Sequence, residues 1–267
     1  MKKSLLAGIT LCLLSACAVS PTGRKQLLLM GNNDVAQMGL SSFQQIKQKE
    51  QVSTDPKQTR YVQCVAQAIT QAIPAQFANT NPGQWEVVVF DSKEVNAFAL
   101  PGGRIGVYTG LLKVAKNQDQ LAAVIGHEVS HVLAQHSNER LSQSQVANMG
   151  MAAADSILKN STTKGPAMAA LGMGVQYGVL MPYSRAHETE ADVLGLQLMA
   201  TAGFNPKESV SLWYNMAAAS NGQAPIEILS THPSDQTRIN KLQSLIPQVM
   251  PMYQQAQAGG VHPQCAG

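Results

Sequence analysis

The stretch Ile125-Gly126-His127-Glu128-Val129-Ser130-His131-Val132-Leu133 decides the fold, because it sets two histidines and a carboxylate within an apolar helical pattern. Residues four apart on a helix share one face, so the imidazoles of His127 and His131 can bind a single metal ion. Glu128 follows the first histidine and is placed to accept a proton from a water molecule at that metal rather than to bind it. Histidines with this spacing are typical of a zinc site.

The residues around this motif distinguish a buried helix from a chance match on the surface. A surface helix with two solvated histidines is the alternative, and the motif alone does not exclude it. Apolar side chains surround this helix almost completely, from Ala122 through Ile125 to Leu133. Unpaired polar groups cost several kcal/mol in such surroundings, so the sequence predicts a buried helix whose polar side chains have partners.

A catalytic zinc site needs a third protein ligand, and the best candidate lies in the segment 183–192, YSRAHETEAD. Glu188 and Asp192 are four residues apart and share a helical face, whereas Glu190 lies about 200° around the helix from Glu188. We therefore predict that Glu188 is the third ligand and that Asp192 orients a ligating histidine through its second ring nitrogen. A charged helix start without a metal is the alternative that these residues leave open.

The remaining pattern predicts an α+β fold that is mainly α. Residues 85–90 (WEVVVF) are typical of a strand, and the segments 96–100 and 104–108 flank a Pro-Gly-Gly turn as a β-hairpin. Asp55 followed by Pro56 is typical of a helix start, and the chain is helical from about residue 110 onward. We expect a small antiparallel sheet packed against the active-site helix and a helical bundle.

Two further motifs, NAFALPGG at 96–103 and THP at 231–233, complete a set of four in order. The set resembles one metallopeptidase family, which contains the CAAX prenyl proteases, the HtpX heat-shock proteases, and soluble periplasmic and mitochondrial quality-control relatives. The resemblance covers residues 20–245. It implies a zincin-like fold with one zinc ion bound by His127, His131 and Glu188, with Glu128 as the base and with Asp192 assisting near the site.

The resemblance implies two further roles. Residues 96–100 would form an edge strand beside the cleft, where a peptide substrate adds as a further strand. An ordinary core hairpin is the alternative for this segment. His232 would approach the metal as a fourth ligand that closes the site, or it would donate a hydrogen bond to the tetrahedral oxyanion. A histidine held by local loop contacts is the competing interpretation.

The first residues predict export. Lys2 and Lys3 precede an apolar stretch, 5–14, that is too short to span a bilayer. Leu14-Ser15-Ala16-Cys17 resembles the bacterial lipobox, and residues 21–27 (PTGRKQL) are similar to lipoproteins of the exported branch of the family. We predict a signal peptide over 1–16, lipidation of Cys17, and a periplasmic protein with a lipid anchor, in the outer membrane. An ordinary secretory signal with an incidental cysteine is the alternative.

The chain after this leader divides into three predicted parts. Residues 17–52 form a lipidated lead-in and helix, 53–250 form the zinc metallopeptidase domain, and 251–267 form a flexible tail. Cys64 and Cys265 form either a disulfide or two free thiols. The apolar run 147–181 predicts two packed helices, because its uncharged part is shorter than the roughly 20 residues of a membrane-spanning helix.

Composition and motifs together predict the function. The formal net charge is +3 on 267 residues, without basic runs, which argues against nucleic acid as a partner. We predict a zinc-dependent endopeptidase that acts on unfolded, misfolded or misassembled envelope proteins and reaches the membrane through Cys17. The alternatives are a non-catalytic or dual-role chaperone or assembly factor for outer-membrane proteins, and a zinc hydrolase of a non-peptide substrate. An intact Glu128 disfavours a purely non-catalytic role, since binding alone needs no base.

Overall fold

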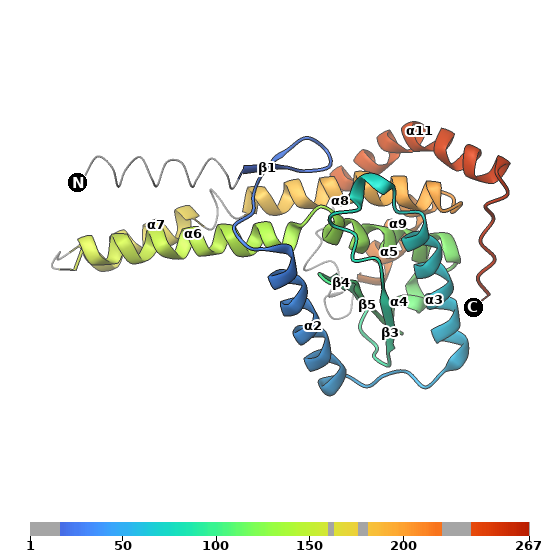
Figure 1. The fold of residues 1–267 in the computed structure, drawn as a ribbon, viewed down its shortest axis with the longest axis horizontal. Helices are drawn as coiled ribbons and strands as arrows, with labels where there is room; N and C mark the ends of the chain where they lie inside the picture. The colour runs from blue at the N-terminus through green and yellow to red at the C-terminus, as the bar shows by residue number, and fades with distance from the viewer. Residues whose placement is uncertain (1–16, 160–162, 176–180, 221–235, 267) are drawn as a thin grey trace.

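The computed structural model describes residues 17–159, 163–175, 181–220 and 236–266. Helices dominate and the strands are short, which confirms the predicted fold class (Figure 1). The elements in chain order are β1 (Cys17–Val19), β2 (Lys25–Leu27), α2 (Asn32–Lys49), α3 (Pro56–Gln71), η1 (Ala75–Phe77), β3 (Glu86–Phe90), β4 (Ala97–Leu100), β5 (Arg104–Tyr108), α4 (Leu111–Val114), α5 (Gln118–Leu133), α6 (His136–Ile157), α7 (Lys164–Val175), α8 (Met181–Thr201), α9 (Glu208–Ser220) and α11 (Gln236–Ala258).

Two helix starts follow directly from local sequence. The Asp55 side chain accepts hydrogen bonds from the Lys57 and Gln58 N–H groups, and Pro56 occupies the first position of α3, as predicted. The metal-site helix α5 begins after Asn117, whose side chain accepts a hydrogen bond from the Gln120 N–H at 2.9 Å. Side-chain acceptors of this kind satisfy backbone donors that a helix leaves free at its start.

The larger sheet has three strands in the order β3-β5-β4. Strands β4 and β5 form the predicted antiparallel hairpin, and the turn between them contains Gly102 and Gly103 at φ angles of 82° and 77°. Strand β3 pairs in parallel with β5, so the sheet is mixed rather than wholly antiparallel as expected. The difference arises because the chain passes from β3 to the far edge before the hairpin returns it to the centre.

Alternating residues of this sheet face two different cores. One face, with Val89, Ala99 and Ile105, packs into the main core with α3 and α5. The other face forms a smaller aromatic cluster under α2, made by Phe43, Phe90, Phe98 and Tyr108. The sheet therefore separates α2 from the helix that carries the predicted metal ligands.

Helices α5 and α8 approach each other closely at a pair of glycines. A Cβ atom on Gly195 would lie 2.9 Å from the backbone nitrogen of His127, and one on Gly126 would lie 3.0 Å from the Gly195 carbonyl oxygen. Any larger side chain at Gly195 would push the two helices apart. This contact brings the helix with Glu188 against the helix with the two histidines.

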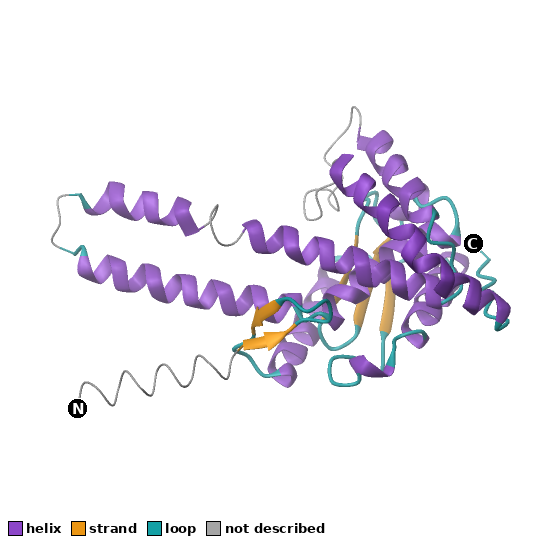
Figure 2. Ribbon diagram, turned by 90° about the horizontal axis from the view of Figure 1, so that it is seen from above, coloured by secondary structure: helices purple, strands orange, loops and turns teal. Residues whose placement is uncertain are grey.

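Helices α6 and α7 extend together away from the sheet (Figure 2). Lys164 of α7 pairs with Asp155 of α6 at 2.8 Å, and the residues that join the helices, 160–162, lie outside the described ones. Two helices in this region agree with the sequence-based expectation. Within the described ranges, none of the helices combines the length and the apolar character that crossing a bilayer requires.

Both ends of the described chain are held more closely than expected. Residues 17–27 form an antiparallel hairpin rather than a simple tether. At the other end, where a flexible tail was predicted over 251–267, α11 continues to Ala258 and Cys265 forms a disulfide with Cys64 of α3. The Gln118 side chain also bonds to the backbone of Pro263 and Cys265. These contacts with α3 and α5 order a segment whose composition alone suggested flexibility.

Candidate metal centre

Three potential metal ligands converge between α5 and α8. His127 Nε2 lies 3.1 Å from His131 Nε2 and 3.3 Å from Glu188 Oε2, and His131 Nε2 lies 3.4 Å from Glu188 Oε1. Donors that each sit about 2.0–2.1 Å from a tetrahedral zinc ion lie about 3.4 Å from one another. Two imidazoles and one carboxylate at these separations therefore fit zinc, with the fourth position left for a water molecule or substrate.

A second carboxylate holds the first histidine. Asp192 Oδ1 lies 3.0 Å from His127 Nδ1, the ring nitrogen that faces away from His131. Burial lowers the pKa of His127, but its contacts with Asp192 and Glu188 outweigh burial and raise the pKa to about 9. This group of carboxylates favours positive charge at the site, as a metal ion would supply. Asp192 thus lies where the sequence placed it, at the second ring nitrogen of a candidate ligand.

The second histidine bonds to another histidine. His136 Nδ1 lies 2.8 Å from His131 Nδ1, although a continuous helix would have turned His136 to a different face. The helix is not continuous, because α5 ends at Leu133 and Gln135 adopts a left-handed conformation at φ 57° before α6 begins. Burial lowers the pKa of His131 well below its ordinary value and that of His136 to about 4, so both rings are neutral.

An arginine from the last helix completes the site. Arg238 donates to Asp192 through Nε at 2.9 Å and Nη2 at 2.6 Å, and its Nη1 lies 3.3 Å from Glu188 Oε2. Its guanidinium also lies over the Trp213 ring, 3.9 Å from the centroid. Burial raises the pKa of Asp192, but Arg238 and His127 outweigh it and lower the pKa. The Asp192 carboxylate is therefore ionised and positioned by a buried cation.

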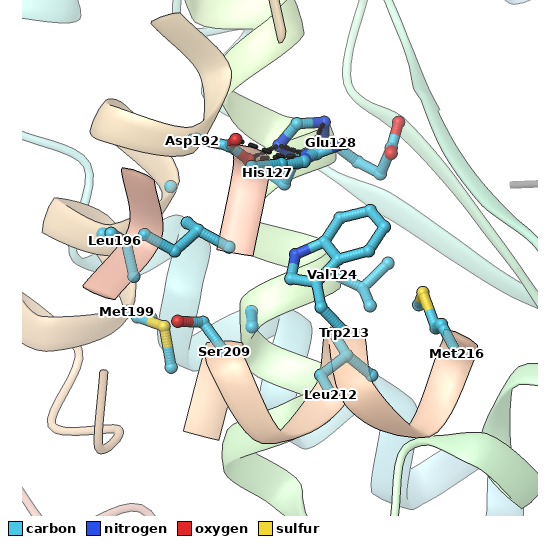
Figure 3. Close-up of a pocket in the computed structure, with 14 residues that line it drawn as sticks. Val124, His127, Glu128, Asp192, Leu196, Met199, Ser209, Leu212, Trp213 and Met216 are labelled. Carbon is cyan, nitrogen blue, oxygen red and sulfur yellow. Dashed lines mark hydrogen bonds and ion pairs between the residues drawn. The ribbon is translucent and has the colours of Figure 1, made fainter. Parts of the chain in front are cut away.

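Glu128 lines a cavity beside these groups (Figure 3). The side chain is on the same helix as the two histidines and is 5% exposed. In Figure 3, the indole of Trp213 lies below His127 and Glu128, and Met199, Ser209 and Leu212 line the lower part of the cavity. Glu128 thus lines the same mostly apolar cavity as His127, the residue before it on α5. This is a suitable place for a base that removes a proton from water.

Glu190, His232 and Cys17 are further residues that the sequence analysis singled out. Glu190 points to the opposite side of α8 from Glu188, as its helical position predicted, and contacts Arg24 and His136. His232 lies outside the described residues, as do residues 1–16. Cys17 begins β1, and its lipidation stays a prediction from the leader sequence.

Two groups of site residues were missing from the sequence-based prediction. Arg238 precedes Leu242, Leu245 and Val249 on the buried stripe of α11, and a charged residue in an apolar stripe is a signal for a paired, buried charge. Gly126 and Gly195 carry no comparable signal, because glycine within a helix has several possible causes.

Comparison with known proteins identifies the family. The model of Peptidase family M48 matches residues 56–246, which include every described residue of the metal centre. The chain belongs to Peptidase family M48. Membership confirms the predicted class of enzyme, a zinc metallopeptidase, and the His-His-Glu cluster is a suitable zinc site.

Relatives of this M48 chain include proteins of mitochondria and of bacteria. The mitochondrial metalloendopeptidase OMA1 of Schizosaccharomyces pombe is 37% identical over 62% of this chain and 48% of the relative. The bovine mitochondrial metalloendopeptidase OMA1 is 34% identical over 87% and 46%. The β-barrel assembly-enhancing protease of Escherichia coli is 27% identical over 82% and 45%. The chain thus spans about half the length of these relatives.

These relatives contradict the predicted location. Six similar proteins, with 32–37% identity, are named as mitochondrial, whereas the bacterial assembly-enhancing protease is less similar at 27%. The prediction of a lipid-anchored periplasmic protein of the outer membrane is therefore wrong by this comparison. It rested on residues 1–17 and on the likeness of residues 21–27 to exported lipoproteins, and these short segments have too little chemistry to specify one compartment.

Proposed function

We propose that this M48 peptidase is an endopeptidase that hydrolyses unfolded or misassembled polypeptides, with His127, His131 and Glu188 as the zinc ligands. The observation that carries the proposal is the spacing of the three donor groups, which matches the edges of a zinc coordination tetrahedron. The donor set is also chemically suited to zinc. One of the three donors, His127, lines a cavity together with Glu128.

Hydrolysis needs a bound zinc ion and side chains that move protons and position the ligands. A zinc ion in this centre supplies a Lewis acid, which makes water more acidic and polarises the peptide carbonyl. Glu128 accepts the proton of the attacking water and then gives it to the leaving amine as the C–N bond breaks. Asp192 holds His127 so that its Nε2 is turned towards His131 and Glu188, where it would bind zinc, and Arg238 positions both Asp192 and Glu188.

Strand β4 supports an extended polypeptide as substrate, because among the described residues it pairs with a strand on one side only, β5. The Tyr108 N–H donates to the Asn96 carbonyl at 3.1 Å, so alternate pairs along this antiparallel ladder are hydrogen-bonded. The main-chain groups of Ala97 and Ala99 then face away from β5, on the side of β4 where no described strand pairs. A substrate strand can add to these groups only when its own backbone is free, which favours unfolded chains over folded ones.

A quality-control role fits this substrate class. One bacterial relative is named as a β-barrel assembly-enhancing protease. By analogy with that name, we propose that this chain acts on misassembled polypeptides. A protein that only bound unfolded polypeptides, without cleaving them, would need strand β4 but would not need Glu128 as a base. The presence of Glu128 beside the ligands therefore favours hydrolysis over binding alone.

The experiment compares the purified protein with Glu128→Gln, a substitution that keeps the size of the side chain and removes the base. We expect zinc in both proteins, cleavage of an unfolded protein such as casein only by the unaltered one, and little cleavage of a stably folded protein. The loss should be at least about 100-fold in kcat, the usual contribution of a general base. Equal cleavage by both proteins would refute the role of Glu128, and zinc absent from the folded unaltered protein would refute the metal site.

A further inference from the structure

The N-terminal hairpin carries a charged residue into the protein beside the metal centre. Strands β1 and β2 lie next to the start of α6 (Figure 2), and Arg24 between them reaches α6 and α8. Its side chain is 21% exposed, while its partners Glu139 and Glu190 are 0% and 2% exposed. This hairpin lies outside the residues that the family model matches, 56–246.

Arg24 joins two buried carboxylates. It donates to Glu139 through Nη1 and Nη2, both at 2.7 Å, and to Glu190 through Nη2 at 2.9 Å and Nε at 3.2 Å. The Thr22 hydroxyl of the same hairpin donates to the other oxygen of Glu190 at 2.7 Å. A planar guanidinium can make such forked contacts, whereas a lysine ammonium acts as a single point charge.

From Glu190 a chain of hydrogen bonds leads to a candidate zinc ligand. Glu190 Oε2 lies 3.1 Å from His136 Nε2, and His136 Nδ1 lies 2.8 Å from His131 Nδ1. To bind a metal through Nε2, His131 must carry its proton on Nδ1 and donate it to His136. His136 must then carry its own proton on Nε2, where the Glu190 carboxylate accepts it.

The hairpin also braces the break between α5 and α6. The Gln26 side chain is buried and donates to the Ala134 carbonyl at 2.7 Å and to Glu139 at 3.1 Å. Glu139 in turn accepts a hydrogen bond from His187, the neighbour of Glu188, at 2.9 Å. The same few residues of the hairpin therefore contact both sides of the site, near His131 on α5 and near Glu188 on α8.

We propose that the N-terminal hairpin is a positioning element of the zinc site, in which Arg24 holds Glu190, Glu190 orients His136, and His136 sets the tautomer and direction of His131. The proposal rests on the proposed ligand role of His131. It assigns Arg24 and His136 a function beyond packing, although neither touches the metal or the substrate. Thr22 and Gln26 assist by holding the hairpin in place.

The test measures zinc affinity of the full-length protein by competition with a chelator of known affinity. Arg24→Ala and His136→Leu should each weaken zinc binding by about 10–100-fold, the usual cost of losing an outer partner of a metal ligand. Lys25→Ala is the matched control, because it removes a neighbouring cation that is exposed. Its zinc affinity should stay within twofold of the unaltered protein. Folded Arg24→Ala and His136→Leu proteins with unchanged zinc affinity would overturn the proposal.

A double-mutant cycle separates a connected chain from two independent structural effects. If Arg24 acts through His136, Arg24→Ala combined with His136→Leu should weaken zinc binding little more than His136→Leu alone. Losses that simply add would overturn the proposed connection. His136→Gln should recover part of the affinity, because its amide oxygen can accept the proton of His131, and no recovery relative to His136→Leu would also count against it.

Two further variants keep the outcome interpretable. If Arg24→Ala does not fold, Arg24→Lys decides the question. The lysine ammonium keeps the charge but not the forked contacts, so it should give an intermediate zinc affinity, and an affinity equal to that of the unaltered protein would contradict the role of Arg24. His131→Ala tests the underlying ligand assignment. Full zinc affinity in His131→Ala would refute the proposed zinc site itself. Loss of zinc in His131→Ala, with no effect of Arg24 or His136 variants, would refute only the positioning element.

Discussion

His127 and His131 lie one turn apart on α5, yet the two arginines that support them indirectly, Arg238 and Arg24, come from opposite ends of the chain. His127 contacts a carboxylate directly, because Asp192 lies 3.0 Å from its Nδ1 and is paired with Arg238 of α11. His131 contacts a second imidazole, His136, whose other nitrogen faces Glu190 and, beyond it, an arginine of the N-terminal hairpin. Both paths end at an arginine.

The difference indicates how each ligand is supported. An ionised carboxylate at a histidine raises its basicity more strongly than a neutral imidazole does, so the Asp192 side should contribute more to zinc affinity. The His136 side instead extends the support across the break between α5 and α6 to a separate segment of chain. Each arginine compensates a buried carboxylate, which would be costly without a cation.

The largest effect on zinc affinity is expected from Asp192, which contacts His127 directly. Asp192→Ala removes the acceptor of the His127 Nδ1 proton and, among the described carboxylates, leaves Glu188 in contact with Arg238. We expect zinc affinity to fall by about 100-fold, the upper end for such partners. Chelator competition measures this affinity. Asp119→Ala is the control, because Asp119 lies in the first turn of α5, before the two histidines, and accepts from the Asn205 N–H. If Asp192→Ala loses less zinc affinity than Arg24→Ala, then the Asp192 contact does not contribute more than the His136 contact, and the expected order is wrong.

An intermediate effect on zinc affinity is expected from the contact between α5 and α8, because the support of both histidine ligands depends on it. In Gly195→Ala the new methyl group would lie 2.9 Å from the His127 nitrogen, so α8 must move away from α5. We expect a loss of about 1–3 kcal/mol in the free energy of unfolding, as for other overpacked sites, together with weaker zinc binding. Gly150→Ala is the control, because nothing lies within 4 Å of its added methyl group. Equal stability of the two variants in urea unfolding would contradict this prediction.

The smallest effect on zinc should come from Glu139, which contacts neither histidine ligand. Burial raises the pKa of Glu139, but hydrogen bonds from His187 and Arg24 outweigh it and lower the pKa from 4.5 to about 2. A carboxyl whose pKa is lower in the folded state stabilises the fold above its unfolded pKa and loses that contribution as pH falls. The stability that Glu139 adds should therefore be full above about pH 4.5 and should decrease towards pH 2.

Urea unfolding of the unaltered protein and Glu139→Gln at several pH values checks this expectation. The difference in the free energy of unfolding should be largest near pH 6 and should shrink as pH falls below 4.5. A difference that stays constant with pH would show that Glu139 does not titrate as a stabilising carboxylate. Zinc affinity measured at pH 7 should change less in Glu139→Gln than in Arg24→Ala, since Arg24 also holds Glu190.

Local spacing predicted the centre of the site. His127 and His131 on one helix, and Glu188 and Asp192 on another, are each four residues apart, and helix geometry alone places such pairs on one face. The same reasoning correctly turned Glu190 away from the metal ligands. The start of α3 and the β4–β5 hairpin were also predictable, because capping and turn residues act over a few neighbouring positions.

Tertiary structure alone decided the contacts that connect distant segments. The sequence does not reveal that Gln135 breaks the helix and turns His136 towards His131. The Gln26 side chain that bonds to the Ala134 carbonyl beside this break is 108 residues away in the chain. Arg24 and Arg238 find their carboxylates across more than 40 residues, and a charged side chain has many possible partners until the chain has folded. The sequence by itself determined which groups could bind zinc, since helix periodicity is local. Packing decided what holds those groups in place, since it depends on the whole fold.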